Sequence, residues 1–537
     1  LLGCPQPNAG VAVAYGGVIF DVCAARVKLH TENTNMKNVA PDLRDIRIYQ
    51  KPGRIDAGAV AACDQLLVIL PERPSKADFA KLPQGAKLQA VRRKHTADSV
   101  PALTTRLANK KQTFVAGGTL AANSTTFEQL SLARKLVAAA TNERAGSLGI
   151  CAIGFDDEAT QRIVANVLAA ALAAAFTMPA FKKEAQPERI RSIRLLGLGE
   201  RMDTLRIEAE ARGNNLARWL TALPPNFLDA VSYAELVASL AKEHGWQYKR
   251  FGTRELSSLN CGAFLAVAQG NDDDSAGIVR LRYRPGKKSA TADLSLVGKG
   301  IMFDTGGINL KPFEYMLDMH GDMQGSAVAL GTFLAISGMQ LPIAVDCWLA
   351  ITENRIGPKA YKSQDVITAA NGKTIQTVHT DAEGRMALAD TLVLASREKP
   401  GIIVDYATLT GSCIRALTTR YSGVFTNREQ LHGDLVDVGE RSGERVWPFP
   451  IGKEFMEDLK SETADFLQCS VKGVGDHILA ASFLAEFVEN DVPWVHMDLA
   501  AGENQKGLGH IASRFTGFGV RYTMSAILDK DLFKAQR

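Results

Sequence analysis

The sequence of 537 residues has no apolar run long enough to cross a bilayer. Residues 9–27 come closest, but Asp21 and Arg26 interrupt them and glycines dilute them. We therefore expect no membrane partner and a soluble protein, with the cytoplasm as its compartment. The chain opens on Leu1, so a location in an organelle after removal of a presequence stays the alternative.

The sequence also lacks a strong excess of one charge. Lys and Arg number 62 against 58 Asp and Glu, which gives a formal net charge of +4. An excess of this size does not by itself indicate a nucleic-acid partner, although it does not exclude one. We interpret short basic clusters, such as residues 92–95, as solvated faces.

Several motifs are missing, and each absence disfavours a class of site. The eight cysteines form no CxxC pair, which argues against zinc ribbons and thioredoxin-type sites and favours free thiols in a reducing compartment. No G-x-S-x-G occurs, since residues 145–149 lack the first glycine, and no H-E-x-x-H occurs. Gly372, Lys373 and Thr374 resemble the end of a phosphate-binding loop, but Ile367 stands where its leading glycine should be.

The length and the alternation of apolar runs predict an α/β protein with two domains. We assign residues 1–40 to no domain, residues 41–199 to a smaller N-terminal α/β domain, and residues 200–222 to a connecting helix. Residues 223–537 form a larger C-terminal α/β domain with a mixed, mostly parallel central sheet. Strands are expected at 65–70, 113–116, 148–153, 193–196, 263–267, 294–297, 343–349, 375–378, 402–406 and 495–499, and helices at 126–139, 158–177 and 204–220.

Two loops of the C-terminal domain concentrate polar residues at the ends of expected strands. The first follows the strand at 294–297 and contains Lys299, Asp304 and Lys311, with Asp322 further on. The second, residues 379–385, follows the strand at 375–378 and precedes a helix. It contributes Asp381, Glu383 and Arg385. Ligands bind at the carboxyl ends of strands in open α/β sheets, and glycines there let the backbone approach a ligand.

If the two loops are neighbours, four carboxylates converge at one place. Their mutual repulsion would force some of them to hold protons unless cations were present. Two divalent ions would balance the four negative charges, and a shared carboxylate would hold the ions ~3.5–4 Å apart. Oxygen ligands accept Zn²⁺ or Mn²⁺, and Mg²⁺ is the alternative for the exchangeable site.

Each of these residues also has an ordinary structural interpretation. An aspartate beside a glycine is usually a turn residue, a lone lysine is usually a surface charge, and an arginine near a helix start is often an ion-pair partner. These interpretations account for the residues one at a time. They account poorly for the whole set, which favours a metal centre.

Three segments resemble the leucine aminopeptidase (cytosol aminopeptidase) family. VGKGIMFDTGGINLKP at 297–312 resembles its first metal loop, TDAEGR at 380–385 its signature, and ATLTG at 407–411 the motif that follows. The resemblance is dense from about residue 224 to 520 and weak before residue 199. It implies a metal-dependent aminopeptidase that hydrolyses N-terminal, leucine-like residues from peptides. It also implies a homohexamer.

The resemblance implies a role for each residue of the set. Lys299, Asp304, Asp322 and Glu383 would hold the tightly bound ion, and Asp304, Asp381 and Glu383 the exchangeable one. Lys299 would ligate as a neutral amine, which requires a pKa lowered by the cations.

The same resemblance implies the catalytic groups. The attacking water would bridge the two ions, and Lys311 would stabilise the oxyanion. Arg385 would hold a bicarbonate ion that acts as general base. Met319, Thr408 and Gly411 would line the pocket for the first side chain of the substrate.

The sequence departs from the family pattern at three places. His379 replaces an asparagine, either as a turn-stabilising group or as a titratable group beside the metals. Asp476 and His477 stand where small residues are usual, and His320 follows pocket residue Met319, so the shape of the pocket is open. The rival interpretation is a scaffold or DNA-binding protein of the same fold with little or no peptidase activity.

Overall fold

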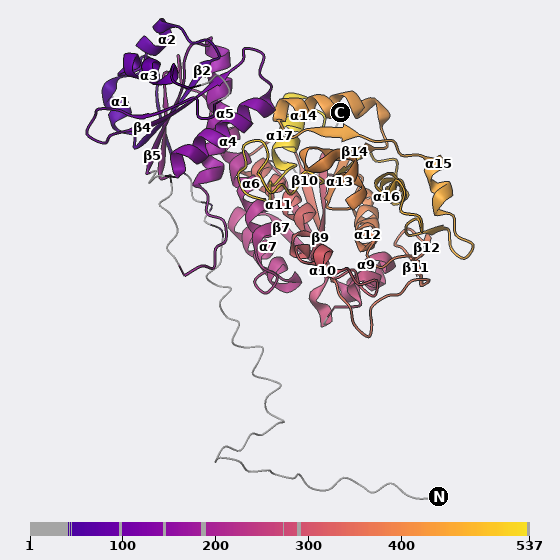
Figure 1. Ribbon diagram of the computed structural model, residues 1–537. Coiled ribbons are helices and arrows are strands. Elements are labelled where there is room, and N and C mark those ends of the chain that lie inside the picture. Colours follow the sequence, from indigo (N-terminus) through magenta and orange to yellow (C-terminus); the bar gives the residue numbers. More distant parts are fainter. Residues whose placement is uncertain are drawn as a thin grey trace, which may run out of the picture. The chain divides into compact units, whose positions relative to one another are not determined.

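The computed structural model describes residues 41, 43, 46–95, 99–142, 146–183, 190–271, 273–286 and 291–533. All of these except Pro41 belong to one compact unit, Asp42–Arg537. The segment 1–40, which the sequence leaves unassigned, lies outside the described residues. Figure 1 shows the elements in chain order.

The first sheet has six strands in the order β1-β6-β5-β2-β4-β3, and all its pairings are parallel except that of β3 with β4. The strands β2 and β5 are almost entirely buried, as expected of parallel strands that are covered on both faces. The strands are β1 (Arg47–Lys51), β2 (Gln65–Pro71), β3 (Leu103–Arg106), β4 (Phe114–Leu120), β5 (Ser147–Ala152) and β6 (Ser192–Leu196).

Two long helices pack against this sheet and against each other, and both begin at sequence-encoded caps (Figure 1). Thr125 and Glu128 form a capping box at the start of α4, and the Asp156 side chain accepts a hydrogen bond from Ala159 N–H at the start of α5. The helices of this part are α1 (Ala57–Ala61), α2 (Lys76–Ala80), α3 (Gly85–Arg92), α4 (Thr126–Thr141) and α5 (Asp157–Ala175).

The predicted helix at 204–220 is observed as α6 (Leu205–Ala222), which ends just before Pro224. It packs on α11 (Gln324–Gly338) at a point where two glycines face each other. A Cβ added at Gly213 would lie 2.2 Å from the Gly331 carbonyl oxygen, so only glycine permits this close approach. The two larger sheets lie on either side of α6 in the sequence, and the domain borders at 199 and 222 stay a prediction.

The second sheet has eight strands in the order β15-β14-β17-β13-β9-β10-β8-β7, and it is mixed. The four neighbours β17, β13, β9 and β10 run parallel at its centre, whereas β7 and β8 are antiparallel. The strands are β7 (Gln247–Gly252), β8 (Gly277–Tyr283), β9 (Leu294–Asp304), β10 (Val345–Asn354), β13 (Ile402–Ala407), β14 (Ser422–Thr426), β15 (Val446–Pro448) and β17 (Trp494–Asp498).

Because the central strands are parallel, their carboxyl ends meet at one edge of the sheet. Asp304 ends β9, Asn354 ends β10, Asp498 ends β17, and Thr408 follows β13. The helices α11 and α12 (Glu383–Arg397) pack against β9. This edge is where ligands bind in open α/β sheets.

The rest of the chain forms a small sheet and shorter helices. A three-stranded sheet has the order β11-β12-β16, and β12 continues into the 379–385 loop. Its strands are β11 (Val366–Thr368), β12 (Thr374–Gln376) and β16 (Phe466–Leu467). The helices are α7 (Ala230–His244), α8 (Thr253–Ser258), α9 (Gly262–Ala268), α10 (Phe313–Met316), α13 (Gly411–Leu417), α14 (His432–Ser442), α15 (Lys453–Met456), α16 (Asp476–Ala485) and α17 (Val520–Asp529).

The expected α/β class with mixed, mostly parallel sheets is confirmed, but one predicted strand is wrong. Residues 263–267 belong to α9. A short apolar run does not distinguish a buried strand from a buried helix turn, and this one contains two alanines, which favour a helix. The helix packs on α12, where the Asp390 carboxylate accepts a hydrogen bond from Phe264 N–H at 2.8 Å.

The expectation of free thiols is confirmed for the cysteines that the structure describes, all six of which are buried and form no disulfide. Burial raises the pKa of the Cys261 thiol to about 12, so this sulfur is held as an unreactive thiol. Within the described ranges, every helix is too short or too polar to span a membrane.

Candidate metal centre

The five predicted metal ligands come from three places at the carboxyl edge of the second sheet. Lys299 lies within β9 and Asp304 ends it, while Asp322 follows a 3₁₀ turn, Met319–Gly321. Asp381 lies in the loop before α12, and Glu383 is the first residue of that helix. Four of the five are buried, and only Asp381 is partly accessible, with 27% of its side chain exposed.

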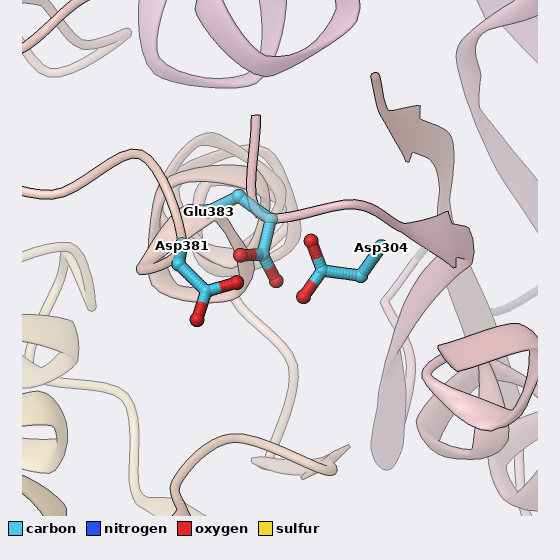
Figure 2. Close-up of side chains that lie close together, drawn as sticks. All are labelled: Asp304, Asp381 and Glu383. Atoms are coloured by element: carbon cyan, nitrogen blue, oxygen red, sulfur yellow. The ribbon is translucent and has the colours of Figure 1, made fainter. Parts of the chain in front are cut away.

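Three of the carboxylates point toward one another (Figure 2). One oxygen from each of Asp304, Asp381 and Glu383 lies within 4.8 Å of the others. Oxygen ligands bind divalent ions at ~2.0–2.6 Å, so the ligands of a single ion lie up to ~5 Å apart. The donor set therefore fits one divalent ion, and its members are those that the family resemblance implies for the exchangeable ion.

The second predicted ion site surrounds the Lys299 amine. Its Nζ lies 2.8 Å from Asp322 Oδ2 and 3.0 Å from Glu383 Oε1, and it donates to the Thr408 carbonyl at 2.9 Å. Burial lowers the pKa of Lys299, but the neighbouring carboxylates together raise it above its ordinary value. Without metal ions this amine is therefore charged, and the neutral form needed for ligation requires cations nearby.

Lys311 provides the second positive charge of the site. Its ammonium lies 2.8 Å from Asp304 Oδ2 and 2.6 Å from Asp381 Oδ1. Burial lowers its pKa, while Asp304 and the other carboxylates raise it, and the net shift is upward. Four carboxylates thus face two ammonium groups, so two negative charges lack a partner within the cage.

The uncompensated charge raises the pKa values of the carboxyl groups. Burial, followed by Glu383 and Asp304, raises the pKa of Asp322 to about 8 against the opposing effect of Lys299. Burial and the same two carboxylates raise the pKa of Asp381 to about 7, and burial also raises that of Glu383. Without cations, the cage therefore favours protonated carboxyl groups.

Metal loading is therefore expected to release protons. Burial and the neighbouring carboxylates raise the pKa values of Asp322 and Asp381, so both carboxyl groups favour their protonated forms until a cation ionises them. Calorimetry in two buffers of different ionisation enthalpy measures this release. The number of protons released per bound metal should decrease toward about pH 9, where the carboxyl groups are already ionised. Only the proton of the Lys299 ammonium is then still released. A release that is absent near neutrality would contradict the charge balance of the cage.

The two loops are joined by hydrogen bonds that the sequence did not reveal. Asn309 Oδ1 accepts from Thr380 N–H at 2.8 Å, and Asn309 N–H donates to Thr380 Oγ1 at 2.8 Å. Asn354 Nδ2 lies 2.8 Å from Asp304 Oδ1 and 3.3 Å from Glu383 Oε2. The expected strand stopped at residue 349, so Asn354 was missed. The polar end of the Ile-Thr-Glu-Asn sequence was the available signal.

Gln468 is a second residue that sequence reasoning missed. Its Oε1 accepts from Val378 N–H and His379 N–H, and its Nε2 donates to the Ala382 carbonyl. The side chain is fully buried and holds the loop that carries Asp381. No local motif marks it, because it reaches this loop from a distant segment.

Gly384 gives Lys299 the space that it occupies. A Cβ added at Gly384 would lie 2.6 Å from Lys299 Cε and 2.7 Å from its Nζ. We expect Gly384→Ala to displace the amine and to weaken metal binding about 10–100-fold. Metal content and kcat/KM measure the effect. Gly433 is the matched control, since it is also the second residue of its helix and its added Cβ meets nothing within 4 Å. Wild-type metal affinity in Gly384→Ala would contradict the packing argument.

Arg385 does not lie open to an anion. Its guanidinium NH2 donates to Asp476 Oδ1 at 2.9 Å and to Oδ2 at 2.8 Å, and its NH1 donates to the Gln468 carbonyl at 3.3 Å. Arg385 is only 2% exposed. Burial lowers its pKa and Asp476 raises it, with a net upward shift, so it is a permanently charged partner.

The three predicted pocket residues are placed unequally around the cage. Thr408 contacts it directly, because its Oγ1 donates to Asp322 Oδ1 at 2.7 Å. Met319 opens the turn before Asp322, and Gly411 begins α13. An open cavity of about 340 Å³ adjoins the cage at Lys311 and Asp381 and is lined by Asn309, Leu310, Lys311, Pro312, Tyr315, His379 and Asp381.

The histidines near the site are held in structural contacts. His379 Nδ1 accepts from Asp381 N–H at 3.3 Å, and burial lowers its pKa, which supports the turn-stabilising interpretation. His477 Nδ1 lies 3.0 Å from Ser412 Oγ, and His320 packs edge-on against Phe515. His496, on the neighbouring strand β17, is fully buried, and its Nδ1 lies 2.6 Å from Asp405 Oδ1.

Comparison with known proteins adds the following findings. The family model described as "Cytosol aminopeptidase family, catalytic domain" matches residues 215–524. Probable cytosol aminopeptidases from Sulfurihydrogenibium and Parasynechococcus marenigrum are each 36% identical, over 327 and 429 residues. The Sulfurihydrogenibium match covers 61% of this chain and 64% of that relative, and the Parasynechococcus match covers 78% of this chain and 87% of that relative. Among solved structures, a mutant of tomato leucine aminopeptidase is 25% identical with a TM-score of 0.80, over 93% of this chain and 100% of that one.

Proposed function

Because the chain belongs to the cytosol aminopeptidase family, we propose that it is a two-metal aminopeptidase that removes N-terminal residues from peptides. The observation that carries the proposal is the cage itself. Asp304, Asp381 and Glu383 converge within 4.8 Å, beside Lys299 and Lys311. Carboxylates in such number, buried with too little positive charge, favour cation binding over a purely structural ion-pair network.

The residues that would hold the ions divide into two overlapping sets. Asp304, Asp381 and Glu383 would hold the exchangeable ion, and Lys299, Asp304, Asp322 and Glu383 the tightly bound one. When bound, two divalent ions would act as Lewis acids on the scissile carbonyl and would lower the pKa of the attacking water. Zn²⁺ or Mn²⁺ suits the oxygen-rich donor set, and Mg²⁺ suits the more accessible site at Asp381.

Lys311 would stabilise the negative charge that develops on the carbonyl oxygen. Its pKa is raised, so it stays protonated, and its side chain lines the cavity beside the cage. A charged donor placed where the oxyanion forms contributes more to the transition state than to the ground state. The ammonium is already oriented by Asp304 and Asp381, so little reorganisation is needed.

A bicarbonate ion at Arg385 does not fit the contacts of this chain. Both hydrogen bonds that the NH2 group donates go to Asp476. A free anion would have to displace the aspartate. We therefore route no proton transfer through bicarbonate.

Substrate preference and assembly complete the proposal. Met319, Thr408 and Gly411 would line a pocket for a leucine-like side chain, and the apolar cavity residues Leu310 and Tyr315 would meet the rest of the peptide. We propose a homohexamer in the cytoplasm. A scaffold or DNA-binding role remains the alternative, and no contact of the metal cage favours it.

Hydrolysis of Leu-p-nitroanilide tests the function directly. The full-length chain is stripped of metal by chelation, then reloaded with Mn²⁺ or Zn²⁺, and compared with substrates that carry other N-terminal residues. We expect activity only after reloading and a preference for leucine over charged residues. A metal-loaded protein that cleaves no aminoacyl substrate would overturn the proposal. Retention on duplex DNA with a steep salt dependence would then support the alternative.

A further inference from the structure

The most unusual contact of the site is the ion pair between Arg385 and Asp476. Both oxygens of the Asp476 carboxylate accept from the NH2 nitrogen of Arg385, at 2.9 and 2.8 Å. The arginine side chain is 3% exposed and the aspartate 26%, so solvent screens the pair poorly from one side. Charge-assisted pairs of this kind are among the strongest hydrogen bonds in proteins.

Asp476 is positioned from both sides of the sequence. Before it, Gln468 N–H donates to the Gln376 carbonyl at 2.8 Å, which extends the pairing of β16 with β12. Asp476 is itself the first residue of α16, which follows Gly475 with its φ of 64°, and the Gly475 carbonyl accepts from Ile478 N–H. Leu479 and Phe483 of this helix pack into the main core. The aspartate is therefore a fixed part of the site.

The Asp476 carboxylate occupies a position where a free anion could otherwise bind, next to the metal cage. Arg385 lies two residues after the metal-cage residue Glu383, on the same helix turn. In a chain that lacked Asp476, an anion at the NH2 edge of Arg385 would have to come from solvent. Here the edge is filled by a group that is covalently part of the protein, at an effective concentration that no free anion reaches.

We propose that Asp476 is the built-in anion of the Arg385 site, so that this chain needs no bicarbonate for its aminopeptidase reaction. The inference rests on the proposed function. Asp476 acts as the partner that keeps Arg385 neutralised and oriented beside the cage. Replacing it by a small residue should convert an anion-independent protein into an anion-dependent one.

The experiment compares the wild type with Asp476→Ala in buffer purged of carbon dioxide, with and without added bicarbonate or formate. We expect neither anion to change the kcat or the Tm of the wild type. Asp476→Ala should lose about tenfold or more in kcat and about 3–6 °C in Tm. Both anions should restore part of each loss, because they refill the vacated edge of Arg385.

Asp476→Ser, which keeps a polar side chain at the start of α16 but frees most of the space beside Arg385, guards against a folding defect and should show the same response to anions. Asp529→Ala is the matched control. Both oxygens of Asp529 also accept from one arginine, here from NH1 and NH2 of Arg206, and Asp529 is 29% exposed, but it lies outside the cage. Its variant should show no anion response.

Two outcomes would overturn the proposal: bicarbonate accelerates the wild type, or Asp476→Ala responds to neither anion. The Tm measurement separates this proposal from the function itself. If no protein in the series hydrolyses a peptide substrate, the proposed function fails, whereas the Tm response of Asp476→Ala to bicarbonate still decides whether the aspartate fills the anion site.

Discussion

Glu383→Gln is expected to lower kcat about 10³-fold or more and to remove at least one ion. Glu383 is 1% exposed, begins α12, and contacts both Lys299 and Asn354. It belongs to both proposed ligand sets, so the loss of its charge weakens both ions together. The ions contribute several kcal/mol to the transition state, and ~4 kcal/mol corresponds to about a thousandfold in rate. Metal analysis and steady-state kinetics measure the two effects.

The glutamine keeps the size of the side chain and an oxygen for Asn354, so the fold should survive. Glu444→Gln is the matched control, because Glu444 is also buried, and burial raises its pKa to about 7. One Glu444 oxygen accepts from Gly519 N–H and Tyr522 N–H, which an amide oxygen can also do. That variant should keep its metals and its activity. If Glu383→Gln retained both ions and its rate, Glu383 would not be a shared ligand.

The sequence predicted the buried parallel strands well and the sheet edges poorly. Runs such as residues 65–70 are continuously apolar because both faces of the strand are covered. The edge strand β7 (Gln247–Gly252) and its neighbour β8 (Gly277–Tyr283) were missed, since Lys249, Arg250 and Arg280 interrupt their apolar patterns. Residues 263–267 show the opposite error, in which a short apolar helix imitates a strand.

The cage was predictable only in part. Asp304 ends β9 of the eight-stranded sheet, whereas Asp381 and Glu383 follow β12 of the separate three-stranded sheet. The two loops are neighbours because α12 packs against β9, and that packing could not be inferred from strand order. The contacts that orient the cage were not predictable. Gln468 and Asp476 reach Arg385 across 83 and 91 residues of sequence, and no spacing rule relates them to it. The sequence showed that Asp476 departs from the family pattern, but only the fold showed that Asp476 pairs with Arg385.

Lys311→Met is expected to have a different signature from Glu383→Gln, since it should reduce catalysis without loss of metal. Methionine keeps the length of the side chain and removes the ammonium that lies 2.8 Å from Asp304 and 2.6 Å from Asp381. Loss of one oxyanion donor lowers kcat about 10²–10³-fold.

The affinity for metal is the deciding measurement for this variant. The Lys311 ammonium neutralises two of the carboxylates that would bind the exchangeable ion, so it opposes cation binding electrostatically. Its removal should leave metal binding unchanged or tighter, while kcat falls. Lys362→Met, at an exposed lysine of a neighbouring loop, should change neither quantity. Wild-type kcat in Lys311→Met would refute the oxyanion role. A parallel loss of metal and activity would instead make Lys311 a structural support of the cage, as an ion pair that holds Asp304 and Asp381 in place.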